Sequence, residues 1–209
     1  MKGEKKYSLR LNKYSDMLSH ELHAKIKGYK RSPNRPRGAK FRPPANVNLR
    51  DLPESFDWRD EGAVTEVKNQ GYCGCCWAFA AIGAVESANF IAKGKQGIIT
   101  ELSEQQLVDC STGWSEHGYT NYGCEGGDQA AAMDYIRDNG GIDTEDSYPY
   151  MGEDGTCNFD PDNIGGEDVG FQYIDSGDED DLKAMVATQV HVANFIYNEC
   201  GKQTFSRVP

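Results

Sequence analysis

The strongest run of apolar positions begins at Cys76 and continues to about Lys93. Its apolar residues recur at helical spacing with alanine between them, which favours a helix buried on most of its surface. These residues are Trp77, Ala80, Ile82, Val85, Phe90 and Ile91. The pattern predicts one long central helix, with other elements packed around it.

Four shorter helices are predicted from apolar spacing and capping residues. The first lies within residues 1–30, with Asp16 or Ser19 near its start and apolar residues at four-residue steps. The second opens with the capping box that begins at Ser103 and runs to Cys110. The third follows Asp128 as cap and runs from Gln129 to Asp138. The fourth begins after Gly177. The apolar positions of the first and fourth are Leu18, Leu22 and Ile26, and Leu182, Met185 and Val186.

Strand signals are confined to Val169–Ile174 and Val190–Tyr197, so the alternating pattern typical of a large sheet is rare. The longest nearly apolar run, Trp77 to Val85, is far shorter than the roughly 20 residues that span a membrane. No membrane partner is therefore expected. The charged N-terminus at Met1 precedes no apolar segment, so either the start is missing or the protein stays inside the cell.

The charge of −11 divides unevenly along the 209 residues. Residues 1–50 carry 14 Lys and Arg against 3 Asp and Glu, whereas residues 51–209 carry 8 against 30. A basic stretch can bind nucleic acid, but its acidic continuation favours pairing within the chain instead. That pairing is expected to weaken as carboxylates protonate near pH 4 to 5, roughly their ordinary range.

Composition suggests three parts. Residues 1–30 hold the first predicted helix, residues 31–51 form a basic, proline-rich linker, and a compact domain begins near Leu52 and covers residues 52–209. The final stretch, residues 190–209, is an atypical tail to that domain.

The candidate chemistry lies in the octapeptide from Gln70 to Trp77. Cys76 begins the predicted central helix, whose free N–H groups and positive dipole end favour a thiolate nucleophile. Gln70 could donate from its side chain to an oxyanion, beside the backbone N–H of Cys76. Together with Cys73 and Cys75, the segment superficially resembles a cluster of metal ligands. A zinc site needs a second close pair of Cys or His residues, and the other cysteines stand singly, so we expect neither metal nor cofactor.

This octapeptide resembles the Gln-x-x-Cys-Gly-Ser-Cys-Trp signature of the papain family of cysteine proteases, in its cathepsin L-like branch. The segment Asn12–Asp16 resembles the core of the family's inhibitory pro-segments, and Leu52–Arg59 looks like a mature N-terminus. The resemblance implies an α+β fold, with a helical lobe around the central helix and a β-barrel lobe that is mostly missing here. It also implies a cysteine endopeptidase precursor that cleaves polypeptides, binds its own pro-segment, is monomeric and is lysosomal or extracellular.

The resemblance also assigns the other cysteines and the substrate-facing residues. Four structural cysteines allow three pairings, and spacing alone does not choose among them. The family pattern implies Cys73 with Cys124 and Cys110 with Cys157. It also makes Gly126, Gly127 and Trp77 candidates for substrate binding, because glycines let a substrate backbone lie against the protein backbone as an added strand.

Three departures from the family pattern stand out. Cys75 replaces a serine, either as a simple substitute or as a partner for Cys76 in a vicinal disulfide. Asp128 and Gln129 stand where relatives often carry apolar residues, which weakens the case for a pocket that prefers bulky apolar groups. Cys200 has no evident partner.

The expected catalytic histidine and asparagine are also missing, since the family's His-Ala-Val-like strand and Asn-Ser-Trp-Gly turn do not occur. None of the histidines that do occur is interpreted as the catalyst. His191 is interpreted as a solvent or packing residue, His117 as a surface residue, and His20 and His23 as titrating helix residues of the pro-segment. Without an imidazole the chain is expected to be nearly inactive. A rival hypothesis is a non-catalytic pseudoenzyme or inhibitor that acts on an intact relative through its pro-segment.

Overall fold

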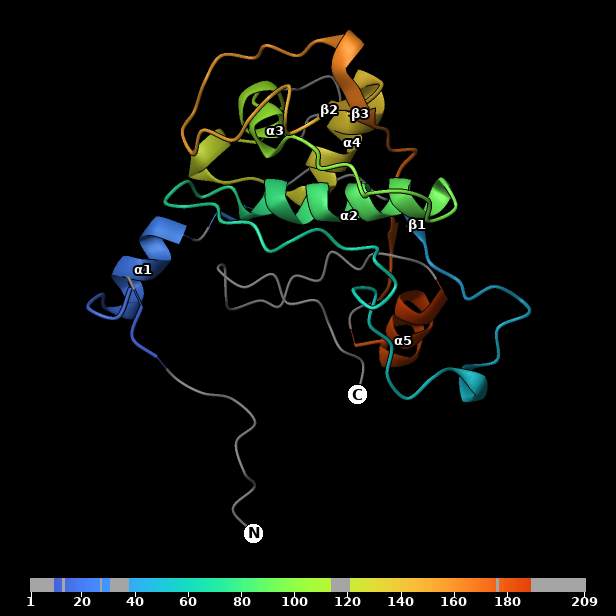
Figure 1. Ribbon diagram of the computed structural model, residues 1–209. Coiled ribbons are helices and arrows are strands. Elements are labelled where there is room, and N and C mark those ends of the chain that lie inside the picture. The colour runs from blue at the N-terminus through green and yellow to red at the C-terminus, as the bar shows by residue number, and fades with distance from the viewer. Residues whose placement is uncertain are drawn as a thin grey trace.

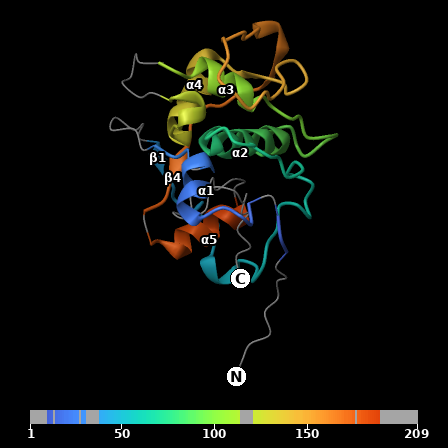
Figure 2. The ribbon, with the colours of Figure 1, turned by 90° about the vertical axis from the view of Figure 1, so that its left-hand side faces the viewer.

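The computed structural model describes residues 10–12, 14–26, 28–30, 38–113, 121–175 and 177–188. Its centre is the long helix α2, Cys76–Ala92. Helices α3 (Glu104–Cys110) and α4 (Gln129–Asn139) lie on one side of α2, and α5 (Glu179–Thr188) lies on the other (Figures 1 and 2). The short helix α1, Ser19–Ile26, belongs to the N-terminal segment.

The helix boundaries follow local capping chemistry. Ser103 Oγ accepts the N–H of Gln106 at the start of α3, and Asp128 Oδ1 accepts the N–H of Ala130 at the start of α4. Gly140 ends α4 with a φ of 79°, a conformation that favours glycine. The helices that these signals predict are therefore present within a residue or two of the expected bounds.

The main core lies where α2 meets α3 and α4. Trp77 and Ile82 of α2 are fully buried there. They join one cluster with apolar residues from α3, α4 and the segments between them: Leu102, Leu107, Val108, Ala132, Tyr135, Ile136 and Ile142. A second, smaller cluster holds the fully buried Phe41 against Ala184 and Met185 of α5. The body of the protein therefore has one main core, with a satellite cluster beside it.

Strands are short and few among the described residues. β1 (Ala39–Lys40) pairs in parallel with β4 (Gln172–Tyr173), and β2 (Ile142–Asp143) pairs antiparallel with β3 (Ile164–Gly166). Within the stretch 169–174, which the sequence predicts to be a strand, only residues 172–173 form a strand. The prediction at 190–197 lies outside the described residues. Among the described residues, three short 3₁₀ turns, Leu49–Asp51, Gly123–Glu125 and Pro161–Asn163, complete an α+β fold.

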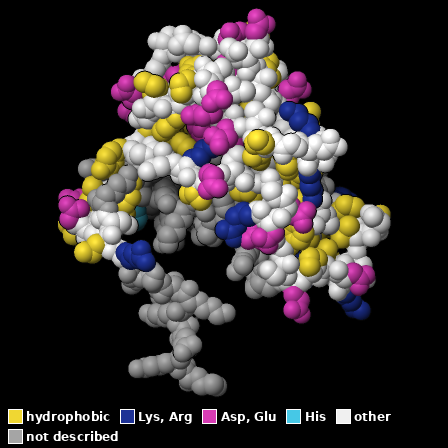
Figure 3. Space-filling model, viewed as in Figure 1, with side chains coloured by type: hydrophobic (Ala, Val, Ile, Leu, Met, Phe, Trp, Pro, Cys, Tyr) yellow, Lys and Arg dark blue, Asp and Glu magenta, His cyan; other side chains and the backbone are white. Residues whose placement is uncertain are grey.

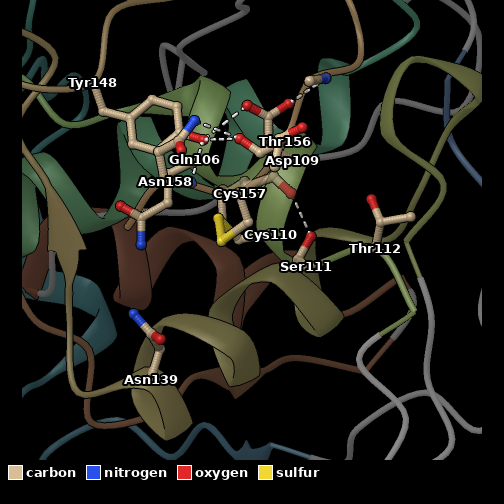
Figure 4. The surroundings of a disulfide bond; sticks show 12 residues. Gln106, Asp109, Cys110, Ser111, Thr112, Asn139, Tyr148, Thr156, Cys157 and Asn158 are labelled. Carbon is tan, nitrogen blue, oxygen red and sulfur yellow. Dashed lines mark hydrogen bonds between the residues drawn. A yellow bond between two sulfur atoms is a disulfide. The ribbon is translucent and has the colours of Figure 1, made fainter. Parts of the chain in front are cut away.

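Two disulfides cross the body: Cys73 to Cys124 and Cys110 to Cys157. Both have the pairing that the resemblance implies. The second lies beside a polar group centred on Tyr148, whose hydroxyl contacts Asp109 Oδ2 at 2.8 Å and accepts the N–H of Asn158 at 3.1 Å (Figure 4). Burial raises the pKa of Tyr148 to about 12, so its hydroxyl stays protonated.

The acidic surplus is visible on the surface of the body. Asp and Glu side chains are spread over the upper part of the molecule in Figure 3, the part that contains α3 and α4. No helix within the described residues combines the length and apolar character needed to cross a membrane.

Candidate functional site

Cys76 is the first residue of α2, and its side chain is partly exposed and not part of a disulfide. The first turn is closed by Cys75 O, which accepts the N–H of Ala78 at 2.8 Å and that of Phe79 at 3.3 Å. The thiol of Cys76 therefore stands at the positive end of a 17-residue helix, where a thiolate is favoured over a thiol.

The loop before Cys76 is fixed at several points. The side-chain Nε2 of Gln70 donates to Cys73 O at 2.8 Å, which orients its amide group. Gly74 N donates to Cys124 O at 2.9 Å, next to the disulfide between Cys73 and Cys124. The loop is thus joined by a covalent and a main-chain link to the segment that continues into Gly126 and Gly127.

Cys75 differs sharply from its neighbour. Its side chain is fully buried, it is a free thiol, and its Sγ lies 2.9 Å from the hydroxyl of Tyr150. Burial raises the pKa of Cys75 to about 12, so this sulfur is a neutral thiol. Cys75 and Cys76 are not joined to each other, and Cys75 occupies its position as a hydrogen-bonded substitute for a hydroxyl.

The glycine pair Gly126–Gly127 is occupied by the N-terminal segment. Lys30 N donates to Gly127 O at 2.9 Å, and Gly127 N donates to Gly28 O at 2.7 Å, so that Tyr29 and Gly127 are partners in a parallel bridge. This is the arrangement by which an extended peptide adds itself to a strand edge. Gly127 therefore takes a peptide backbone in this structure, and the peptide is the protein's own chain.

The contact is close enough to require glycine on both sides. A Cβ built on Gly28 would lie 1.4 Å from Gly74 O, and one built on Gly126 would lie 2.5 Å from Gly28 O. Because Gly74 stands two residues before Cys76, the N-terminal segment passes directly beside the loop of residues 70–75 that leads into Cys76. The Nζ of Lys30 lies 4.9 Å from the ring centroid of Tyr122 and adds a cation–π contact.

Trp77 supports this edge from beneath. It is fully buried, its Nε1 lies 3.3 Å from Gly123 O, and a Cβ on Gly127 would come within 2.7 Å of its ring. Its place in substrate binding remains a prediction, and in this structure its ring lies under Gly127 within the core. Asp128, one of the departures from the family pattern, caps α4, while Gln129 is buried with an unpartnered Oε1.

A buried ionic cluster near the loop was missed by the sequence analysis. Lys68 Nζ lies 2.7 Å from Glu86 Oε1 and 2.8 Å from Glu104 Oε1, and both carboxylates are almost fully buried. Thr65 Oγ1 and Leu102 N also donate to Glu86. The three charged residues lie 18 residues apart or more, so no local motif could have indicated them. Burial raises the pKa of Glu104 to about 7, against the opposing charge of Lys68.

The remaining candidates are placed as follows. His20 and His23 are exposed on α1, and His117, His191 and Cys200 lie outside the described residues. Within the described ranges, no group of three or more His, Cys, Asp or Glu residues could hold a metal ion.

Comparison with known proteins agrees with this geometry. The family described as papain family cysteine protease matches residues 52–205. Cathepsin L of Sarcophaga peregrina is 50% identical over 193 residues, covering 89% of this chain and 54% of the relative, and procathepsin L of Mus musculus is 39% identical over 183 residues, covering 88% and 51%. The structure of digestive procathepsin L2 from Tenebrio molitor superposes with a TM-score of 0.75 at 40% identity, covering 87% of this chain and 56% of that one.

The chain belongs to the papain family of cysteine proteases. Its relatives at 40 to 50% identity include proteins named cathepsin L, and its structural neighbours include proteins named procathepsin L. The chain spans about half the length of the curated relatives that it matches.

Proposed function

We propose that this chain carries the nucleophile half of a cysteine-type endopeptidase precursor, with Cys76 as the nucleophile. The observation that carries the proposal is the reduced, partly exposed thiol at the N-terminus of α2, beside the Gly126–Gly127 pair, which already holds a peptide backbone. A polypeptide substrate would lie along Gly126 and Gly127, with its carbonyl carbon presented to Cys76 Sγ. The neutral Cys75 is unsuited to the role because its pKa is raised to about 12.

Gln70 is assigned the stabilisation of the oxyanion, together with the backbone N–H of Cys76. Donors that are already oriented where charge develops contribute strongly to acyl transfer, and removing one typically lowers the rate by about 10² to 10³. The bond from Gln70 Nε2 to Cys73 O supports this role, because it fixes the amide group beside the nucleophile loop.

Residues 1–30 and the linker 31–51 act as an inhibitory pro-segment. Gly28 and Lys30 use the Gly127 backbone groups that a substrate would need, so substrate and pro-segment exclude each other. The two disulfides favour an oxidising compartment, in agreement with a lysosomal or extracellular location. We expect the chain to be monomeric.

Peptide hydrolysis also needs a group that protonates the leaving amine, ordinarily an imidazole. The only histidines in the described ranges, His20 and His23, are exposed on α1. This observation favours a second candidate function, in which the chain binds an intact relative through its pro-segment without cleaving peptides itself.

Labelling with a peptidyl epoxide separates the two functions, because ring opening requires an activated thiolate. Under reducing conditions the endopeptidase proposal expects one adduct, located on Cys76 by mass spectrometry and absent from the Cys76→Ser variant. The Cys75→Ser variant is the matched control and should label like the wild type. A wild-type chain that stays unlabelled, yet inhibits an intact papain-family protease, would establish the second function instead.

A further inference from the structure

Tyr150 lies far from Cys76 in sequence, yet it contacts the segment around the nucleophile at three points. Its hydroxyl donates to Gln70 O at 2.8 Å and lies 2.9 Å from Cys75 Sγ. Its ring meets that of Phe79, in the first turn of α2, edge to face with centroids 5.0 Å apart. The three contacts fall before, next to and after the nucleophile.

The direction of each hydrogen bond follows from the number of hydrogens. A main-chain carbonyl only accepts, so the single hydroxyl hydrogen of Tyr150 goes to Gln70 O. The contact with Cys75 must then run the other way, with the S–H donating to the tyrosine oxygen. A neutral Cys75 has that hydrogen to give, which agrees with the burial of its side chain.

Tyr150 is itself held from outside the loop. Its backbone N–H donates to Glu145 Oε1 at 2.9 Å, and it lies on the segment that follows β2 rather than on the nucleophile loop. Gln70 therefore has two anchors: its side chain is fixed within the loop through Cys73 O, and its main chain is fixed to a separate segment through Tyr150.

We propose that Tyr150 is a positioning residue for the oxyanion hole. Its hydroxyl accepts a hydrogen bond from the thiol of Cys75 and donates to Gln70 O, and so holds the main chain of Gln70 in place. The proposal rests on the role given above to Gln70. Cys75, the residue that departs from the family signature, keeps a donor where a serine hydroxyl would stand, and so takes part in positioning rather than in chemistry.

The test compares two reagents on the full chain. A peptidyl aldehyde adds Cys76 Sγ to its carbonyl carbon and leaves an oxygen in the oxyanion hole, whereas iodoacetamide alkylates the same thiol without forming an oxyanion. Tyr150→Phe should weaken aldehyde binding about tenfold, since the loop keeps its disulfide and is displaced only slightly. Its rate of alkylation at Cys76 should stay within twofold of wild type.

Matched variants complete the test. Tyr148→Phe removes another buried hydroxyl two residues away, one that contacts Asp109 rather than the loop, and should leave the aldehyde affinity unchanged. Cys75→Ser keeps a donor and should behave as wild type. Cys75→Ala should weaken aldehyde binding, and combining it with Tyr150→Phe should add little, because both act through one relay.

The outcomes distinguish the two proposals. If Gln70→Ala weakens aldehyde binding while Tyr150→Phe matches Tyr148→Phe, the positioning role is overturned and the oxyanion role of Gln70 stands. Equal losses with aldehyde and iodoacetamide in Tyr150→Phe would indicate general distortion and would also overturn it. If Gln70→Ala has no effect, or the wild type holds no aldehyde, the oxyanion assignment fails and the inference fails with it.

Discussion

The helical body and the N-terminal segment are held together by different forces. The body packs side chains from α2, α3 and α4 into one core and adds two disulfides. The N-terminal segment docks mainly through its main chain. Residues 28–30 bond to Gly127, while Ala39 N and Phe41 N donate to Phe171 O and Tyr173 O at 3.2 and 2.8 Å. Among the described residues of that segment, Phe41 is the one large side chain that is fully buried.

The difference matters for function. Side-chain packing specifies one partner, whereas backbone pairing accepts any extended peptide that approaches closely enough. A site that holds the chain's own N-terminal segment by backbone bonds to Gly127 has the groups to hold another extended peptide in the same way. The body should therefore lose global stability when it is altered, whereas the docked segment should detach without unfolding the body.

The largest effect is expected from the disulfide that joins the loop before Cys76 to the segment that continues into Gly126 and Gly127. Replacing both Cys73 and Cys124 by serine releases a loop with a sequence separation of 51 residues. The free energy of unfolding should fall by about 4 kcal/mol on the chain-entropy estimate. Unfolding in urea measures this loss. The control is Cys75→Ser, which replaces a cysteine that is not in a disulfide. A loss as small as that of the control would mean that the loop is held mainly by noncovalent contacts.

The sequence predicts the helices of the body better than the contacts of the N-terminal segment, because the signals for the helices are local. Ser103 and Asp128 cap helices that begin at the next residue, so each signal lies next to the helix that it predicts. The expected capping box at Ser103 is only half formed, because the side chain of Gln106 does not accept the N–H of Ser103. That side chain instead bonds Asp143 N and the hydroxyl of Tyr135. The pairing of Gly28 with Gly127 and the contact of Tyr150 with Gln70 join distant segments through main-chain atoms, which every residue carries. No residue pattern could therefore mark them.

The buried ionic cluster should make the stability of the body depend on pH. Because burial raises the pKa of Glu104 from 4.5 to about 7, its contribution is fully present below pH 4.5 and is lost as pH rises through about 7. The upper limit of that loss is roughly 3 to 4 kcal/mol, since one pKa unit corresponds to about 1.4 kcal/mol. Glu104→Gln should flatten the dependence between pH 5 and 7.5.

The control for this prediction is Glu101→Gln, an exposed carboxylate on the same connection before α3. Unfolding free energies of the three proteins at both pH values test it. If the free energy of unfolding changed with pH equally in wild type and Glu104→Gln, Lys68 would compensate the buried carboxylate fully.

A change at Gly28 should detach the segment and leave the body folded. A methyl group at Gly28 would lie 1.4 Å from Gly74 O, so Gly28→Ala cannot keep the two bonds to Gly127. At roughly 1 kcal/mol for each hydrogen bond, docking should weaken by about 2 kcal/mol. Faster amide exchange at Lys30 and faster epoxide labelling of Cys76 would report it. Gly83→Ala, where a Cβ meets open space, is the control that should change neither readout.

The smallest effect is expected from the ion pair between Lys40, in the basic part of the sequence, and Asp175, in the acidic part. Lys40 of β1 pairs with Asp175, and that hydrogen bond raises the pKa of Lys40, but 41% and 57% of the two side chains are exposed. Exposed pairs contribute little and are screened by salt. Lys40→Ala should therefore change amide exchange at Phe41 less than about threefold. A much larger change, abolished by salt, would mean that charge rather than backbone pairing holds the linker on β4.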